Sequence, residues 1–549
     1  MQDHRIDSIV AAHAAQRPHR PAIVFQDTEL TYADLEAEVA RMAGWLTAVG
    51  IGRYDRVALY ARNHPETFVT LLAVSRIGAL MVPLNWRLSE AELAWQIKDS
   101  APALILHGTE FAAMATGLAA TAGCRCHEIG GSLDAARAGH AMAEGAASGD
   151  AAAELLVVYT SGTTGLPKGA VLAQPAMIAN AVMSHHAYAM TADDVVLNLL
   201  PLFHVGGLNI QPLPALLLGA QVVIAPAFNP GDALAAIERR RITQVTVVPT
   251  ILSALLAHPG WDTARLDSLR MIAIGSTDVP VPIIAAVHDR GLPVVQVYGA
   301  TETAPTAIYQ TADIAFDTAG SIGRAGCACE IRITGPDGAD LPEGEVGEIW
   351  VRGANILTRY WRDEAETAAA ITDGWFHTGD MARIDGDGLY WFADRLKHVI
   401  ISGGENIYPA ELERVLRDLP GLSEFAIIGR DNYVEFTRLG WSNPFGLRQR
   451  SEMQRVIYTL EDGKLYRRYW PVLDTNVATE YQEDVLIDDV ARFTVRYLDK
   501  TPQGEWQWLE LWPDVALAAV PVWQQRLPKS IEVEIELEDG DTIHRFYRT

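Results

Sequence analysis

The sequence predicts a doubly wound α/β fold for the larger N-terminal part of the chain and a β-rich region after it. Short apolar runs alternate with helical patterns in the first part, and these helical periods disappear after Asp431, where Trp, Tyr and acidic residues become frequent. A length of 549 residues also exceeds what one hydrophobic core usually holds. We therefore expect at least two domains.

Strand-like and helix-like segments alternate from the start of the chain. Strands are predicted at 57–60 and 80–83, and helices at 32–49 and 65–77. The alternation resumes with apolar runs at 222–225, 245–248, 271–274 and 294–297. Such βα units are typical of a largely parallel sheet, whose ligands lie at the carboxyl ends of the strands. Between the two series, residues 112–153 are expected to hold only a weakly specified helix and a surface loop.

The overall charge and the chain start exclude several classes of partner. The formal net charge of −25 repels nucleic acid and anionic lipids, so no nucleic-acid partner is expected. The N-terminus lacks a basic, apolar leader, and apolar stretches such as 213–228 are too short for a membrane span. We expect a cytoplasmic protein without a membrane span.

The four cysteines form two C-x-C pairs. They are Cys124, Cys126, Cys327 and Cys329. This spacing differs from the C-x2-C pairs of structural zinc sites, so a zinc site is not expected there.

A glycine-rich segment follows the apolar strand at 154–158. It reads Y-T-S-G-T-T-G-L-P-K-G at 159–169. Glycines allow backbone N–H groups to approach an anion, and hydroxyl groups with one lysine can complete a cradle for polyphosphate. The spacing of Gly162 and Lys168 does not fit the Walker A pattern. Taken alone, the segment is equally consistent with a polar surface turn.

Four later motifs accompany this segment in order. They read L-P-L-F-H at 200–204, Y-G-A-T-E at 298–302, G-W-F-H-T-G-D at 374–380 and D-R-L-K at 394–397. The series resembles the adenylate-forming superfamily, specifically its AMP-binding acyl-CoA synthetases, over about residues 5–430. The resemblance implies a large α/β domain over 1–395, which activates a carboxylic acid with ATP.

The same resemblance assigns nucleotide-binding roles. The residues it assigns to ATP are Thr160, Ser161, Gly162, Thr163, Thr164, Gly165, Lys168, Ser276, Tyr298, Gly299, Thr301, Asp380 and Arg395. Thr163, Thr164 and Lys168 would hold the β and γ phosphates, and Thr301 the α phosphate. Glu302, with Thr163, would ligate Mg2+, which favours one carboxylate together with substrate phosphates.

The nucleoside contacts leave alternatives open. Tyr298 would stack on adenine, and the less favoured alternative is a core residue at a strand end. Asp380 would accept the ribose hydroxyls, with Arg395 adding positive charge. An aspartate in a surface turn is the less favoured alternative for Asp380, and its motif context argues against it. His204 resembles a gate to the thiol channel, while a histidine among apolar neighbours is often simply packed.

The resemblance continues past residue 395 with a hinge and with a loop that indicates CoA as the acyl acceptor. Lys397 occupies the family's hinge position. The segment S-G-G-E-N-I-Y-P-A-E at 402–411, with Gly403 and Gly404, resembles the loop that lines the pantetheine path of CoA ligases. The resemblance therefore implies ATP, Mg2+ and CoA as cofactors and a small carboxylic acid as substrate. Catalysis would depend on Thr163, Lys168, His204, Glu302 and Lys397, without a protein nucleophile.

The family pattern breaks off after about residue 430. A C-terminal Gly-Lys motif, whose lysine completes adenylation, is not found, because Gly463-Lys464 comes too early and Lys529 lacks the preceding Gly. Residues 396–430 thus read as a truncated α+β small domain. Residues 431–549 resemble the soluble domain of minor pseudopilin J of type II secretion, in segments 433–438, 443–446, 450–456, 465–471 and the strand from Leu527.

The C-terminal region shows two β patterns. Asp462-Gly463 between apolar runs predicts a hairpin turn. Ile531, Val533, Ile535 and Leu537 alternate with glutamates, which predicts one face on a core and one in water.

Pseudopilins begin with a leader and an apolar helix, and neither is visible before Asp431. We interpret the chain as a fusion of two reading frames, which should stay out of the periplasm.

Three hypotheses for function follow. The first is an acyl-CoA ligase with impaired adenylation. The second is a non-enzymatic interaction protein acting through its pseudopilin-like tail, with other pseudopilins as partners. The third, a domain that loads a carrier protein, is disfavoured by the glycine pair at 403–404.

Segments 205–209, 274–278 and 304–308 should line a pocket for an aliphatic or aryl acid. A homodimer is a further hypothesis.

Overall fold

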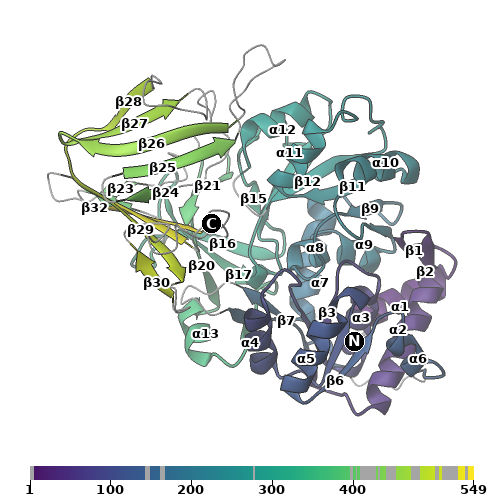
Figure 1. Cartoon of the computed structure of the whole chain (residues 1–549). Helices are drawn as coiled ribbons and strands as arrows, with labels where there is room; N and C mark the ends of the chain where they lie inside the picture. Colours follow the sequence, from purple (N-terminus) through teal and green to yellow (C-terminus); the bar gives the residue numbers. More distant parts are fainter. Residues whose placement is uncertain are drawn as a thin grey trace. The chain divides into compact units, whose positions relative to one another are not determined.

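The computed structural model describes most of the N-terminal part and the separate strands of the C-terminal part. The described residues are 5–141, 149–160, 167–275, 279–395, 400–402, 405–407, 428–430, 433–439, 453–470, 482–500, 506–509, 530–537 and 542–548. The chain forms two compact units, 1–392 and 393–549. Each unit has its own sheets (Figure 1).

A seven-stranded sheet forms the first layer of the N-terminal unit, in the order β18-β8-β7-β4-β3-β5-β6. The strands are β3 (Arg56–Tyr60), β4 (Leu80–Pro83), β5 (Leu104–His107), β6 (Arg125–Glu128), β7 (Glu154–Thr160), β8 (Lys168–Ala173) and β18 (Arg359–Tyr360). The strands β7, β4, β3, β5 and β6 run parallel, whereas β8 and β18 are antiparallel additions. The predicted parallel core is thus present, with an antiparallel edge.

Five α-helices belong to the same part of the chain. They are α2 (Tyr32–Ala48), α3 (Glu66–Ile77), α4 (Glu90–Ser100), α5 (Ala112–Ala122) and α6 (Ser132–Arg137), with a short 3-10 turn, η1 (Thr109–Phe111). The helices α2 and α4 begin with reciprocal caps, Thr31 with Asp34 and Ser89 with Glu92. The expectation of only a helix and a loop within 112–153 was incomplete. Its Ala-rich sequence carries no strong strand pattern, yet β6 pairs with the edge of β5.

A nine-stranded sheet forms the second layer, in the order β15-β14-β13-β12-β11-β9-β10-β1-β2. Its strands are β1 (Pro21–Phe25), β2 (Thr28–Thr31), β9 (Val195–Asn198), β10 (Gln221–Ile224), β11 (Gln244–Val247), β12 (Met271–Gly275), β13 (Val294–Tyr298), β14 (Ile308–Tyr309) and β15 (Arg324–Ala325). The inner strands pair in parallel and the outer ones antiparallel. This confirms the second predicted series of strands.

The other helices before β13 are α1 (Ile6–Gln16), α7 (Gln174–Ala187), α8 (Val205–Asn209), α9 (Pro212–Leu218), α10 (Pro230–Arg240), α11 (Pro249–Ala257) and α12 (Val281–His288). Helix α9 contacts β9 and β10 of this sheet and α12 contacts β13, whereas α1 packs mainly on α2 and α3, and α7 contacts β8 of the seven-stranded sheet. Figure 1 shows α10, α11 and α12 grouped beside β11 and β12. Side chains of this group, such as Leu234, Leu252 and Ile284, form one buried cluster with Val245 and Ile272. Burial of such apolar surface is the main force that holds helix to sheet.

A third, antiparallel sheet lies at the end of the N-terminal unit, and its last strand runs across the boundary at residue 392. It contains β16 (Cys329–Thr334), β17 (Gly347–Gly353), β19 (Ile371–Thr372), β20 (Trp375–Ile384) and β21 (Tyr390–Arg395), with α13 (Glu364–Ala370) beside it. Its inner face, including Ile333, Ile349 and Ala382, packs with Tyr298 and Ile308 of the nine-stranded sheet. Shared packing therefore fixes β20 close to the carboxyl end of β13.

The C-terminal unit is built from strands in its described segments. The strands are β22 (Ile400–Ser402), β23 (Glu405–Ile407), β24 (Ile428–Arg430), β25 (Tyr433–Leu439), β26 (Met453–Glu461), β27 (Lys464–Trp470), β28 (Gln482–Ile487), β29 (Val490–Lys500), β30 (Trp506–Leu509), β31 (Ser530–Leu537) and β32 (Thr542–Arg548). They form a β22-β23 pair, a β24-β25-β26-β27-β28 sheet and a β30-β29-β31-β32 sheet.

The predicted hairpin turn is confirmed. Asp462 and Gly463 separate β26 from β27, and both have positive φ, 49° and 73°, as a two-residue turn of type I′ requires.

The prediction of a water-facing acidic row on β31 was wrong for Glu532. This side chain is 5% exposed, and its Oε2 lies 2.6 Å from Nε of Arg496 on β29. The alternating pattern could not show that arginines from the neighbouring strand cover the glutamates. Among the described helices, none combines the length and the apolar character needed to cross a bilayer.

Candidate active site

The two strands that flank the glycine-rich segment are neighbours in the seven-stranded sheet. β7 ends at Thr160 and β8 begins at Lys168, and these two residues are paired across the antiparallel ladder. The strand predicted before the segment is therefore confirmed, and the residues on either side of the segment, Thr160 and Lys168, lie next to each other. Ser161, Gly162, Thr163, Thr164 and Gly165 lie outside the described residues.

Lys168 points toward the segment that carries β18 and α13. Its ammonium forms an ion pair with Glu366 of α13 and lies 5.8 Å from the centroid of the Tyr360 ring. The lysine side chain is 11% exposed. Neither Glu366 nor Tyr360 belongs to a motif identified in the sequence. The pairing of β18 with β8, Tyr360 opposite Ala170, brings both residues to the lysine.

Glu302 lies at the same place, between Thr160 and Tyr360. The Tyr360 hydroxyl donates a hydrogen bond of 2.9 Å to Oε1 of Glu302, and the Thr160 hydroxyl donates one of 3.4 Å to the same oxygen. Removal from water raises the pKa of Glu302, and the two hydroxyl donors oppose this rise. The structure thus gathers Thr160, Lys168 and Glu302 around Tyr360.

The loop that carries Gly299, Thr301 and Glu302 is tightly folded after β13. A short 3-10 turn, η2 (Thr301–Thr303), is followed by the cis peptide Ala304–Pro305. A Cβ on Gly299 would lie 1.7 Å from the carbonyl oxygen of Pro305, so only glycine fits there. Thr301 is partly buried at the start of the turn.

Three buried asparagines form hydrogen bonds with the backbone of this loop. The Asn355 amide donates to the carbonyls of Thr303 and Thr306, at 3.3 and 2.9 Å. The Asn209 amide donates to the Ala304 carbonyl at 2.5 Å, and Oδ1 of Asn180 accepts from the Thr306 N–H at 3.1 Å. Buried backbone groups need such partners. These asparagines come from separate segments, and no sequence pattern identified them.

Tyr298 and Asp380 meet across two sheets. The Tyr298 hydroxyl donates a 2.8 Å hydrogen bond to Oδ2 of Asp380, which is 7% exposed. The Tyr298 ring is 9% exposed, and its centroid lies 6.2 Å from that of Phe392. The two motifs that were assigned to the nucleoside therefore lie together, although the alternative of a core tyrosine is equally compatible with this burial.

His204 occupies the N-cap position of α8, at the edge of an aromatic and cationic cluster. Its ring centroid lies 4.5 Å from that of Phe203. The Arg87 guanidinium lies over Phe203 at 6.0 Å and over Trp86 at 4.9 Å. Although His204 is exposed as a residue, the surrounding protein lowers the pKa of its imidazole, and the charge of Arg87 adds to this effect. His204 is therefore set to remain neutral near pH 7.

Several predicted residues cannot be placed with these groups. Ser276, Lys397, Gly403 and Gly404 lie outside the described residues, and only the backbone of Arg395 is described, at the end of β21.

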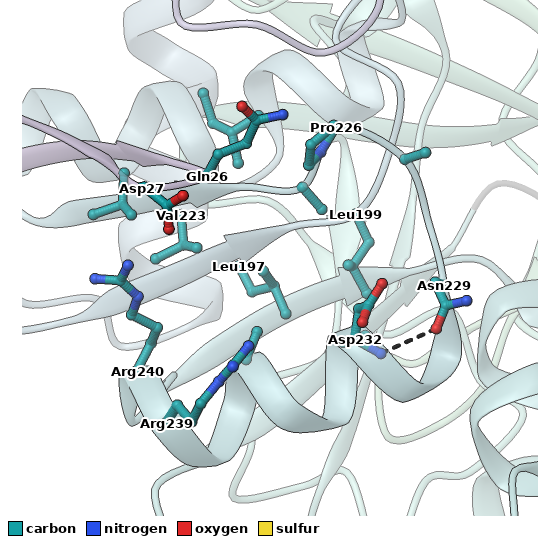
Figure 2. A pocket seen from close by; sticks show the side chains of 16 residues that line it. Gln26, Asp27, Leu197, Leu199, Val223, Pro226, Asn229, Asp232, Arg239 and Arg240 are labelled. Atoms are coloured by element: carbon teal, nitrogen blue, oxygen red, sulfur yellow. Dashed lines mark hydrogen bonds between the residues drawn. The ribbon is translucent and has the colours of Figure 1, made fainter.

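Hollows on the described part of the N-terminal unit include one beside α10 and one beside α13. One, of about 550 Å3, lies between the nine-stranded sheet and α10, with Leu197, Leu199 and Val223 on its floor and Asp27 and Arg240 among its rim residues (Figure 2). It contains no residue of the motifs. The other, of about 860 Å3, is lined by β18 and α13 and includes Tyr360 and Thr367. Only the second hollow borders the residues that surround Lys168.

Known proteins resemble both parts of the chain. The family described as AMP-binding enzyme matches residues 10–361, and the family described as type II secretion system protein J matches 404–549. Indoleacetate–CoA ligase of Aromatoleum aromaticum is 45% identical over 429 residues, covering 76% of this chain and 84% of the relative. Feruloyl-CoA synthase of an Amycolatopsis species is 40% identical over 437 residues, with 78% and 86% covered.

A solved structure gives the same result for the fold. The o-succinylbenzoate CoA synthetase of Bacillus subtilis, solved with the acyl-adenylate intermediate OSB-AMP, superposes with a TM-score of 0.69 at 32% identity, covering 76% of this chain and 84% of that one. The chain therefore belongs to the AMP-binding enzyme family, among its adenylate-forming CoA ligases, and its C-terminal part matches protein J of the type II secretion system.

Proposed function

We propose that the N-terminal unit activates a carboxylic acid with ATP and then transfers the acyl group to CoA. In the first step a carboxylate oxygen attacks the α phosphorus, the bond to the bridging oxygen breaks, and pyrophosphate leaves. In the second step the CoA thiol attacks the acyl carbon and AMP leaves. The observation that carries this proposal is the convergence of Thr160, Lys168, Glu302 and Tyr360 at the ends of β7 and β8.

The proposed phosphate site combines hydroxyls, backbone N–H groups and one ammonium. Thr163, Thr164 and Lys168 would hold the β and γ phosphates, and Thr301 the α phosphate. The net charge of the chain, −25, repels a polyphosphate, so binding depends on these local donors. Such sites act by positioning and by neutralising charge.

The environment of Glu302 fits a ligand of Mg2+. Its partly buried carboxylate accepts hydrogen bonds from two neutral hydroxyls, and a raised pKa indicates that its charge is incompletely compensated. A hard cation bound by this oxygen, by Thr163 and by phosphate oxygens would supply the compensation. Mg2+ bound there would neutralise developing charge on the phosphates.

The pair of Tyr298 and Asp380 supports the proposed nucleoside contacts. A carboxylate offers about four lone-pair positions, so the bond from Tyr298 does not by itself prevent Asp380 from accepting ribose hydroxyls. The hydrogen bond would orient both side chains before ATP arrives. We also propose that Tyr298 stacks on adenine, and that Gly299, Ser276 and Arg395 take part in binding the nucleotide.

The second half-reaction would use His204 and the segment after β21. A neutral imidazole beside Phe203 fits a gate between the acyl site and the thiol channel better than a charged one. Lys397 would act as hinge, and Gly403 and Gly404 would line the pantetheine path.

An aryl-substituted acid is the substrate class that we favour. The two relatives at 45% and 40% identity are named for indoleacetate and for feruloyl-CoA, both of which contain an aromatic ring. The described parts of the expected pocket, including Val205–Asn209, are largely apolar and buried. A planar ring would fit such walls.

Adenylation should nevertheless be weak in this chain. The match to protein J begins at residue 404, where the family's small domain would continue toward its lysine. Loss of one preorganised charge at a reacting centre typically lowers the rate by about 10^2 to 10^3. ATP binding should survive, because the N-terminal unit supplies most of the proposed contacts.

The test combines ATP binding with turnover. Isothermal titration of the full chain with MgATP should detect binding, while aryl-acid-dependent pyrophosphate exchange and hydroxamate formation should be weak. A chimera with a complete ligase small domain after residue 395 should regain exchange. Absence of ATP binding would overturn the proposed function, and exchange in the full chain equal to that of the chimera would overturn the impairment.

A second candidate function rests on one observation, the match of residues 404–549 to protein J. In that case the C-terminal unit would bind other pseudopilins and the ligase part would be dispensable. Copurification of the full chain with type II pseudopilins, retained after Lys168→Gln, would support this function. Failure of the full chain to bind them would exclude it.

A further inference from the structure

Lys168 already has an anionic partner in the structure. Its ammonium contacts the carboxylate of Glu366, and its side chain is only 11% exposed. The lysine is also the first residue of β8, directly after the glycine-rich segment. An incoming phosphate group must therefore share the ammonium with Glu366 or displace it.

The start of α13 determines where Glu366 stands. Oδ1 of Asp363 accepts a hydrogen bond of 2.9 Å from the Glu366 N–H, as an N-cap does. The Thr367 hydroxyl donates to the Asp363 carbonyl at 2.6 Å and accepts from the Tyr360 N–H at 2.9 Å. The backbone at Glu366 is thereby anchored to β18. Its side chain is 32% exposed and can still turn away from the lysine.

We propose that Glu366 is a positioning residue that competes with polyphosphate for the ammonium of Lys168. It would hold the lysine when the site is empty, release it when the β and γ phosphates of ATP bind, and take it back as pyrophosphate leaves. Carboxylate and phosphate oxygens are both anionic acceptors, so they compete for the same N–H donors.

Two roles of Glu366, competition with phosphate and simple support of Lys168, predict opposite changes in pyrophosphate affinity when the charge of Glu366 is removed. If Glu366 competes, removing its charge removes one competing anion from the ammonium, and pyrophosphate binds more tightly. If Glu366 only keeps Lys168 in place while phosphate binds to another side of the ammonium, the same change loosens the lysine and weakens binding. The inference rests on the proposed function, because it requires that Lys168 binds phosphate.

Direct titration of the full chain with inorganic pyrophosphate and Mg2+ separates these cases. Glu366→Gln should bind pyrophosphate roughly fivefold more tightly, which corresponds to about 1 kcal/mol. Glu366→Asp, which keeps the charge but shortens the side chain, should also tighten binding, and it serves if the glutamine variant does not fold. The matched control is Glu364→Gln, two positions earlier on the same helix and exposed, which should leave the affinity unchanged.

Lys168→Gln distinguishes failure of the inference from failure of the proposed function. This variant should weaken pyrophosphate binding, and adding Glu366→Gln to it should then have no further effect. Weaker or unchanged binding by Glu366→Gln, with Lys168→Gln still harmful, would overturn the competition and leave the proposed function intact. A Lys168→Gln variant that binds as tightly as the unaltered chain would overturn both.

Discussion

Tyr360 donates a hydrogen bond of 2.9 Å to Oε1 of Glu302, while its ring lies 5.8 Å from the ammonium of Lys168. One tyrosine thus contacts both the carboxylate proposed for Mg2+ and the lysine proposed for phosphate. Neither contact would exist without the pairing of β18 with β8.

Tyr360→Phe should weaken both stability and metal-dependent nucleotide binding. The variant removes a donor from the partly buried Glu302 carboxylate, and such losses cost about 1–3 kcal/mol. The pKa of Glu302 should rise further. We expect a lower midpoint in urea unfolding and weaker MgATP binding in calorimetric titration.

Tyr188→Phe provides the control for this prediction. The Tyr188 hydroxyl is buried and has no hydrogen-bond partner among the described residues, so its removal should be neutral or slightly stabilising. Equal loss of stability in the two variants would contradict the importance of the bond to Glu302.

Glu66 should make the N-terminal unit less stable as pH rises. Burial raises the pKa of Glu66 to about 7, even though Nη1 of Arg137 lies 2.7 Å from its Oε1 and opposes the rise. Between about pH 4.5, the ordinary value, and pH 7 the folded state binds more protons than the unfolded state. The free energy of unfolding therefore falls with pH, by about 1.4 kcal/mol for each unit of pKa difference.

Glu66→Gln should make the free energy of unfolding depend less on pH in this range, because glutamine does not titrate. Urea unfolding at pH 5, 6, 7 and 8 checks the slope. Glu90→Gln, at an exposed position in the first turn of α4, should keep the slope of the unaltered chain. Parallel profiles for the unaltered chain and Glu66→Gln would show that Glu66 does not cause the fall.

Gly299→Ala should disrupt the loop that carries Thr301 and Glu302. The added methyl group would lie 1.7 Å from the Pro305 carbonyl oxygen, so the loop must move. We expect MgATP affinity to drop by at least tenfold in calorimetric titration. Gly117→Ala, within α5 and with no atom within 4 Å of the new Cβ, should instead stabilise by about 0.5–1 kcal/mol. Unchanged ATP affinity in Gly299→Ala would contradict the proposed role of this loop.

Asn355→Asp tests the buried asparagines behind the same loop. A carboxylate of nearly equal shape cannot donate to the carbonyls of Thr303 and Thr306, and it places charge beside them. We expect a loss of about 1–3 kcal/mol in unfolding free energy, or more because a charge is buried. Both chemical denaturation and ATP titration should report the loss. A variant with normal stability would show that the loop is held by other contacts.

The local parts of the structure followed from the sequence. The helix at α2, the strand β7 and the turn at Asp462 were predicted because periodicity and turn chemistry involve only neighbouring residues. β6 was missed, since its short polar sequence becomes a strand only by pairing with β5. The acidic row of β31 was misjudged for a similar reason, because Arg496 covers Glu532 from another strand.

The sequence by itself determined the succession of βα units and the motifs that resemble those of adenylate-forming ligases, including Lys168 and Glu302. Both features depend only on short segments, in which the pattern is set by residues that are close together in the sequence. Only the tertiary structure decided that Lys168 faces Glu366, that Tyr360 bonds to Glu302, and that asparagines support the loop after β13. These contacts join segments far apart in the chain, and they exist only once the sheets and helices have packed.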